Sequence, residues 1–178
     1  MKKVIIISST PRRCGNSEVL AEEFARGAAE AGHAVEVIDL CDHNINYCVA
    51  CYSCRETGKC VIGDGMNEIA EKLIEADVIV FATPVYFYSM SGQLKVFIDR
   101  LVPVYTKIRA DIYIIATMWD DNPDMMEKVI DAIRGCTADC FEDCEEKGVL
   151  YGVGLDEIGD AEKRPEYMAT AYEMGKNV

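Results

Sequence analysis

Short apolar runs of strand character alternate along the chain with longer segments of helical periodicity, and this alternation limits the possible folds more than any other feature. The first run, 4–7, is a continuous β-branched stretch of the kind that forms a buried parallel strand. The predicted strands cover residues 4–7, 34–40, 78–82, 112–117 and 149–153. The predicted helices cover 16–31, 66–74 with Asp64 as its cap, 94–101, 123 into the 140s, and a segment from Pro165 onward. This order predicts an α/β fold: a doubly wound, five-stranded parallel sheet with helices on both faces.

Length and charge narrow the classes of function. A chain of 178 residues fits one domain, 1–178. With 18 basic and 31 acidic residues the net charge is −13, which argues against nucleic acid or an anionic membrane as a partner. No apolar stretch reaches the roughly 18 residues of a membrane span. The first apolar run also ends too early for a signal peptide, so we expect a cytoplasmic protein.

The loop between the first strand and the first helix, 8–17, has the composition of an anion site. It offers hydroxyl groups, a glycine, and backbone N–H groups at a helix N-terminus, which together can hold a phosphate. The loop lacks the Walker lysine and the glycine spacing of a dinucleotide site, so a terminal phosphate monoester such as that of FMN fits better. The alternative is a capped helix whose side chains satisfy only its own first turn. The candidate residues are Ser9, Thr10, Arg12, Cys14, Asn16 and Ser17.

The loops after the third and fourth strands could form the walls of the same site, because ligands of such sheets bind beyond the carboxyl ends of the strands. Three successive aromatic residues, 86–88, are costly in an exposed loop unless something flat covers them, and an isoalloxazine ring is flat. The alternatives are core packing or a dimer contact. The candidates here are Pro84, Val85, Tyr86, Phe87, Ser89, Thr117 and the single tryptophan, Trp119.

A long loop after the second strand, 41–63, shows no periodicity and contains five of the nine cysteines. In a reducing compartment such clustering indicates metal or redox chemistry. Cys48, Cys51 and Cys54 form a CxxCxxC run, and Cys60 follows after five further residues. Three thiolates at this spacing can surround a cubane cluster, whereas zinc more often takes two separate CxxC turns. Metal-free thiols remain a third possibility.

Two further groups of residues have simpler interpretations. Cys136, Cys140 and Cys144 are spaced by four within the predicted fourth helix, so we expect them to be buried as small apolar residues. Two small positive islands stand out against the acidic background. One is Arg12 and Arg13 in the first loop, and the other is Arg55 and Lys59 beside the cysteines, where they could steer an acidic partner.

The first loop, the stretch PVYFYSMSGQLKVFIDR (84–100) and the cysteine loop together resemble the flavodoxin-like NAD(P)H-dependent FMN reductases, above all their iron–sulfur flavoprotein branch. The resemblance covers about residues 3–101 and implies a flavodoxin-like sheet with the cysteine-rich loop after its second strand. It implies FMN held at the phosphate by Thr10, Arg12, Asn16 and Ser17, and at the ring by Pro84, Val85, Tyr86 and Phe87. It further implies Cys48, Cys51, Cys54 and Cys60 as ligands of a [4Fe–4S] cluster, in a homodimer or homotetramer.

Two positions depart from the family pattern. Residues 9–13 read Ser-Thr-Pro-Arg-Arg where the family often has Gly-Ser-Pro-Arg-Lys, a conservative change for anion binding. Residues 119–122 are acidic where relatives often have glycines, which leaves the third wall of the ring site open to question.

These observations predict an FMN-dependent oxidoreductase in which the flavin performs the chemistry and no side chain acts as acid or base. Electrons would pass from a reduced donor, ferredoxin or NAD(P)H, to a small-molecule acceptor through the [4Fe–4S] cluster. One alternative is a plain NAD(P)H-dependent FMN or quinone reductase without a cluster. The other is a flavin-free metal-binding or redox-sensing module.

Overall fold

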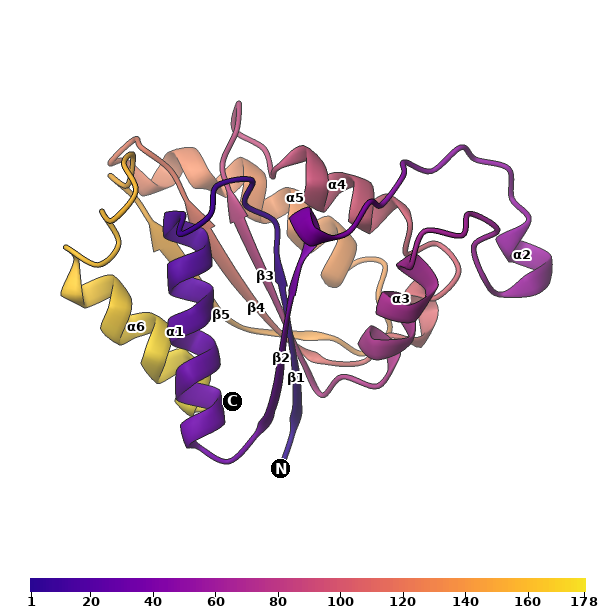
Figure 1. Ribbon diagram of the computed structural model, residues 1–178, viewed down its shortest axis with the longest axis horizontal. Coiled ribbons are helices and arrows are strands. Elements are labelled where there is room, and N and C mark those ends of the chain that lie inside the picture. The colour runs from indigo at the N-terminus through magenta and orange to yellow at the C-terminus, as the bar shows by residue number, and fades with distance from the viewer.

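The predicted parallel sheet forms the centre of the computed structural model, which describes residues 1–178 (Figure 1). Its strands lie in the order β2-β1-β3-β4-β5, and every pair is parallel. The strands are β1 (Lys3–Ser8), β2 (Ala34–Asp39), β3 (Val78–Pro84), β4 (Asp111–Thr117) and β5 (Glu145–Gly152). The helices are α1 (Asn16–Glu30), α2 (Cys54–Thr57), α3 (Met66–Ile74), α4 (Gly92–Asp99), α5 (Glu127–Thr137) and α6 (Pro165–Lys176). The predicted fold class is therefore confirmed.

Alternation of side chains along β1 divides the core between the two faces of the sheet. Successive side chains of a strand point to opposite faces. Ile5 and Ile7 accordingly pack with α3, α4 and α5, whereas Val4 and Ile6 pack with α1 and α6. Figure 1 shows the same division, with α1 and α6 on the left of the sheet and α3 and α4 on the right. A strand buried on both faces must be apolar throughout, which is why β1 is a continuous apolar run.

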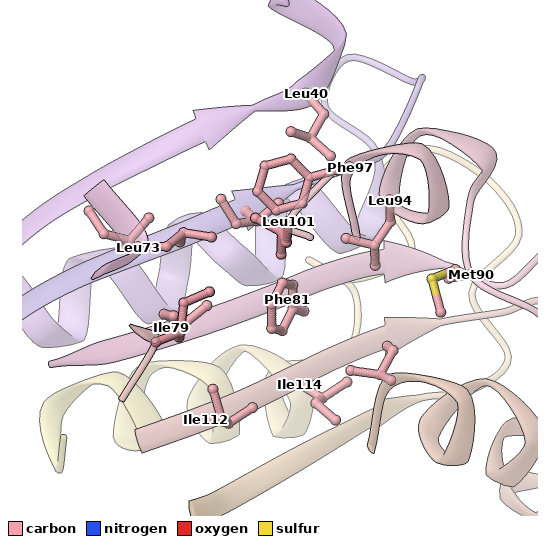
Figure 2. Close-up of a cluster of buried hydrophobic side chains, with 14 of the residues drawn as sticks. Leu40, Leu73, Ile79, Phe81, Met90, Leu94, Phe97, Leu101, Ile112 and Ile114 are labelled. Atoms are coloured by element: carbon pink, nitrogen blue, oxygen red, sulfur yellow. The ribbon is translucent and has the colours of Figure 1, made fainter. Parts of the chain in front are cut away.

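The larger core anchors α4 above the middle of the sheet. Phe97 and Leu101 lie over Phe81 of β3, and Leu94 lies nearer the carboxyl end of the strands (Figure 2). All four side chains are 0–1% exposed. Ser91 is the N-cap of α4, and its hydroxyl accepts a hydrogen bond from the Leu94 N–H at 3.2 Å. This packing fixes α4 relative to the sheet, and Asp99 and Arg100 at its C-terminal end line a cavity that is described below.

On the other face, α1 and α6 cross at two glycines. A Cβ atom added at Gly27 would lie 2.1 Å from the Tyr172 carbonyl oxygen. One added at Gly175 would lie 2.0 Å from the Phe24 carbonyl oxygen. The backbones approach so closely that neither position has room for a side chain.

Three expectations need correction. The helix predicted from 123 into the 140s is a 3₁₀ turn (Pro123–Met126) followed by α5, which ends at Thr137. Cys140 and Cys144 are therefore not on a helix. Cys140 is exposed, and Cys136 and Cys144 are half-buried, whereas all three were expected to be buried. The fifth strand begins at Glu145 rather than at Val149, because the charged residues that open it lie at the exposed end of the sheet.

The region around the cysteines also differs from expectation. The loop 41–63 contains one helical turn, α2, and Figure 1 shows this loop extending away from the sheet beyond α3. Asp64 was expected to cap α3. The N-cap residue is Gly65, although Asp64 Oδ1 does accept a hydrogen bond from the Met66 N–H at 3.4 Å. The carboxylate is directed mainly to Arg100. None of the helices has both the length and the apolar composition needed to cross a membrane.

Candidate functional site

A cavity of about 240 Å³ opens at the carboxyl edge of the sheet, where the loops after β1, β3, β4 and β5 meet. We call it the strand-end cavity. It brings together nine of the candidate residues: Thr10, Arg12, Asn16, Ser17, Pro84, Val85, Tyr86, Thr117 and Trp119. Gly15, Met118, Leu155, Asp156 and Ile158 complete the lining. Four loops that are far apart in the sequence therefore form one polar-and-apolar pocket, as the strand-end rule predicts.

The wall contributed by the loop after β5 was missed in the sequence. Asn16 holds this loop in place: its amide nitrogen donates to the Glu157 carbonyl oxygen at 3.1 Å, and its side-chain oxygen accepts from the Ala161 N–H at 3.0 Å. Arg12 adds a third bond, from Nη1 to the Asp156 carbonyl oxygen at 2.9 Å. Two residues expected to face a phosphate thus fix the opposite wall. The only signal that could have revealed this loop is its position after a strand.

At the other end of the cavity, the first turn of α1 presents unused hydrogen-bond donors. The first N–H groups of a helix have no intrahelical partner, and the cap residue Gly15 provides no side chain to satisfy them. The Ser17 hydroxyl is buried and has no hydrogen-bond partner. A Cβ atom at Gly15 would lie 2.9 Å from the Arg12 carbonyl oxygen and 3.0 Å from Thr10 Oγ1, so only glycine allows the loop to close this tightly. The arrangement suits an anion that accepts several hydrogen bonds.

The aromatic segment forms a tight hairpin at the rim. Tyr86 and Ser89 exchange two backbone hydrogen bonds, of 2.8 and 3.0 Å, around Phe87 and Tyr88. Both central residues have positive φ angles, 50° and 61°, a conformation that costs energy for residues with side chains. The turn leaves Phe87 fully exposed. Tyr86 is thereby the one aromatic side chain of the hairpin that lines the cavity.

Four candidates lie outside the lining of the strand-end cavity. Phe87 and Ser89 belong to the hairpin, and Cys14 is exposed in the first loop with a positive φ of 55°. Ser9 is buried, and its hydroxyl donates to the Ala82 carbonyl oxygen at 2.9 Å. That bond ties the first loop to β3, so Ser9 supports the cavity from beneath.

The four predicted metal ligands line a second cavity, of about 290 Å³, at the base of the loop 41–63. We call it the cysteine cavity. Cys48, Cys51, Cys54 and Cys60 share it with Arg100 and with apolar neighbours such as Val61 and Val102. No group of three or more metal-ligating side chains in the structure is arranged to hold a metal ion. The thiols are thus gathered around one space without converging on one point.

Hydrogen bonding and burial shift the pKa values of the cysteine thiols in opposite directions. The Ser53 backbone and side chain donate to Cys51 and lower the pKa of its thiol. Burial, by contrast, raises the pKa of Cys136 to about 12 and raises the pKa of Cys144. A thiolate is the form that ligates metals. The loop cysteine is therefore better suited to ligation than the cysteines near α5.

A buried ion pair between Arg100 and Asp64 lies beneath the cysteine cavity, and no sequence pattern indicated it. Arg100 Nη1 and Nη2 donate to the two carboxylate oxygens at 2.8 and 3.0 Å. The pair is almost completely buried, with side-chain exposures of 1% and 5%. Hydrogen bonding to the guanidinium holds the pKa of Asp64 far below its usual range, and Asp64 in turn raises the pKa of Arg100.

The two positive islands are largely neutralised. Arg13 forms ion pairs with Asp39, at 2.5 Å, and with Asp42. Lys59 pairs with Glu71 at 2.7 Å. Arg55 has no carboxylate partner and stacks over the Tyr52 ring, 4.2 Å from its centroid. The expected islands thus reduce to Arg55 beside the cysteines and to Arg12, which also bonds to a carbonyl group.

Comparison with known proteins gives a family match over the first two thirds of the chain. Residues 2–118 match the model of a family described as NADPH-dependent FMN reductase. The chain is 45% identical over 102 residues to an iron-sulfur flavoprotein of Methanocaldococcus jannaschii, covering 57% of this chain and 53% of that protein. It is 37% identical over 100 residues to an iron-sulfur flavoprotein of Methanosarcina thermophila, covering 56% and 52%. The alignments span about half the length of these relatives.

Solved structures show the same fold over nearly the whole chain. An NAD(P)H:quinone oxidoreductase from Methanothermobacter marburgensis superimposes with a TM-score of 0.75 at 22% identity, covering 99% of this chain and 95% of that one. An azoreductase from Bacillus anthracis gives a TM-score of 0.75 at 16% identity and covers 100% of both chains. At these identities the likeness establishes the flavodoxin-like architecture.

Proposed function

The chain belongs to the NADPH-dependent FMN reductase family, and we propose that it is an FMN-dependent oxidoreductase that binds the flavin in the strand-end cavity. The observation that carries this proposal is the unpartnered, buried Ser17 hydroxyl at the start of α1, inside a cavity with apolar walls. A buried hydroxyl without a partner is destabilising, so its presence there favours a ligand that accepts a hydrogen bond.

The residues of the cavity divide into two groups by their chemistry. Thr10, Ser17 and the N–H groups of the first turn of α1 would hold the phosphate, with the helix dipole adding attraction. Pro84, Val85 and Tyr86 would contact the ring on one side, and Trp119 would contact it on the other. Asn16 and Arg12 would act mainly by holding the loop after β5 against the ligand. When bound, FMN supplies two-electron exchange with a hydride donor and one-electron exchange with a metal cluster.

We further propose that Cys48, Cys51, Cys54 and Cys60 hold a [4Fe–4S] cluster in the cysteine cavity. The donor set supports this, because four thiols around one largely apolar cavity are the usual ligands of such clusters. The relatives named iron-sulfur flavoprotein add support by similarity. The lowered pKa of Cys51 favours the thiolate form that ligation needs.

A second candidate is an NAD(P)H-dependent FMN or quinone reductase whose cysteines carry no cluster. The observation that favours it is that the thiols do not converge into a metal-binding group. Both candidates share the flavin site and a small-molecule acceptor. They differ in the donor: the cluster suits a one-electron carrier such as ferredoxin, whereas NAD(P)H could serve either form.

We also propose a homodimer or homotetramer as the working form. A fully exposed Phe87, held in a strained turn beside the strand-end cavity, is costly unless another surface covers it. In addition, the cysteine loop extends away from the strand-end loops within one chain, as Figure 1 shows. A second copy could cover the hairpin and bring its cysteine loop to the flavin.

The test is the absorption spectrum and the iron content of protein purified without oxygen. FMN with about four irons per chain is expected. The variant Cys51→Ala should lose the iron and keep the flavin. Cys140→Ala is the matched control, because Cys140 is exposed and outside the cysteine cavity, and it should keep both. Flavin without iron in the unaltered protein would establish the second candidate, and absence of flavin would refute the flavin site.

A further inference from the structure

Arg100 is the one buried cation of the cysteine cavity, and its contacts go beyond a simple ion pair. The residue directly follows α4 and is 2% exposed. Besides Asp64, its Nη1 donates to the Asn46 carbonyl oxygen at 2.5 Å. Its third nitrogen, Nε, is buried and has no hydrogen-bond partner. Two of the three guanidinium nitrogens are thus used for structure, and one remains free.

The two used nitrogens close the loop that carries the cysteines. Asn46 lies two residues before Cys48, and Asp64 lies four residues after Cys60. The Asp64 carboxylate also accepts from the Asn46 N–H at 2.9 Å, so both ends of the loop meet at the guanidinium. On the far side, Asn67 of α3 binds the main chain of Cys60 through two bonds of 2.8 Å. The loop is therefore fixed at its base by α3 and α4.

The free nitrogen has few possible acceptors. A buried donor on a charged group is costly to leave unpaired. Arg100 lines the cysteine cavity beside Cys60, and its other neighbours there include the apolar side chains Val61, Ile62 and Val102. Among the side chains that line this cavity with Arg100, the thiols, Asp99 and the Tyr52 hydroxyl are able to accept a hydrogen bond. Tyr52 is 57% exposed, and its ring stacks with Arg55. Asp99 forms an exposed ion pair with Lys95 at 2.5 Å, which leaves sulfur as the natural partner.

We propose that Arg100 is a positioning residue of the cysteine cavity: its Nε–H donates to a cysteine sulfur of the ligand set, and this raises the reduction potential of the cluster. The inference rests on the cluster proposed above. A hydrogen bond to a ligand sulfur withdraws electron density from it and stabilises the more negative, reduced form of the cluster. A fixed positive charge in a buried site acts in the same direction, and Asp64 offsets part of that effect.

The test is the midpoint potential of the reconstituted protein, measured by anaerobic titration. Arg100→Lys keeps the positive charge beside Asp64 and removes the Nε–H. The expected result is unchanged FMN and iron content with a more negative potential. A tenfold loss in the equilibrium constant for reduction, about 59 mV for a one-electron couple, is the size expected. Lys59→Gln is the matched control, because it removes an exposed cation next to Cys60, and it should leave the potential unchanged.

The possible results distinguish a failure of this inference from a failure of the proposed cluster. Arg100→Lys with iron retained and an unchanged potential overturns the inference, and so does an equal shift in Lys59→Gln. If Arg100→Lys does not fold, Asp64→Asn combined with Arg100→Met removes both buried charges and the Nε–H donor together, and the same comparison of potentials applies. A protein that takes up no iron after reconstitution overturns the cluster and this inference together, while the FMN site stands on its own spectrum.

Discussion

Asn16 and Ser17 are neighbours at the start of α1, yet the structure predicts opposite effects of removing their side chains. The Ser17 hydroxyl is buried and unpartnered, whereas the Asn16 amide makes two hydrogen bonds to the loop after β5. Ser17→Ala should therefore leave the stability of the flavin-free protein unchanged or raise it. Asn16→Ala should lower the free energy of unfolding, because each lost bond contributes about 0.5–1.5 kcal/mol and two are lost, for a total of about 1–3 kcal/mol.

Flavin affinity should respond differently from stability. A hydrogen bond to a charged group contributes about 1.5–3 kcal/mol, so Ser17→Ala should weaken FMN binding about tenfold to a hundredfold. Asn16→Ala should weaken it as well, because the loop that carries Leu155 and Ile158 loses its attachment. Urea unfolding of the flavin-free protein gives the stabilities, and titration of FMN fluorescence gives the dissociation constants.

Two results would refute this reasoning. If Ser17→Ala binds FMN as tightly as the unaltered protein, the hydroxyl does not contact the phosphate. If Ser17→Ala instead loses more than about 1 kcal/mol of stability, the hydroxyl has a partner in the flavin-free protein. A stable Asn16→Ala variant would show that the loop after β5 is held by other contacts.

Four other changes test different parts of the molecule. The pKa of Asp64 in the folded protein lies below its ordinary value, so the stability that this carboxylate provides is present above about pH 4 and is lost as the pH falls. The urea midpoint of Asp64→Asn should be lower than that of the unaltered protein at neutral pH. It should also change less than that of the unaltered protein when the pH is lowered. Gly27→Ala should cost about 1–3 kcal/mol or more, because the new Cβ would lie 2.1 Å from a backbone oxygen of α6. Gly135→Ala, with nothing within 4 Å, should gain about 0.5–1 kcal/mol. Thermal unfolding measures both glycine variants. Arg55→Glu combined with Lys59→Glu should slow reduction by ferredoxin at low ionic strength, and the effect should be smaller at high salt. A rate that changes neither with the charge reversal nor with the salt concentration would indicate a small neutral donor.

The hydrophobic pattern was sufficient to predict the sheet. The errors concern the fourth helix and the fifth strand, where contacts between distant residues determine the structure. The buried strands are continuous apolar runs, so their order along the chain could be read directly. The spacing of Cys136, Cys140 and Cys144 imitates a helical stripe, but the helix ends at Thr137. The next segment turns back through Asp143, with a φ of 53°, to begin β5. Tertiary pairing with β4 overrides the helical spacing there.

The strand-end cavity was largely predictable because parallel strands bring their following loops to one edge. The same rule, applied to the fifth strand, would have included Leu155, Asp156 and Ile158. What it could not show is the direction of individual side chains. Asn16 lies where the pattern placed it, and its amide is turned toward Glu157 and Ala161, which are more than 140 residues away.

The cysteine cavity shows a different limit of sequence reasoning. Spacing identifies thiols as possible ligands, because covalent order alone keeps Cys48, Cys51 and Cys54 near one another. The group that organises them is not local: Arg100 is 36 residues from Asp64 and 54 from Asn46. An arginine in a helical stretch is normally an exposed residue, and only the packing of α4 on the sheet buries this one. A CxxCxxC run therefore specifies donors, whereas the shape and the charge of the cavity depend on the helix packed beneath it.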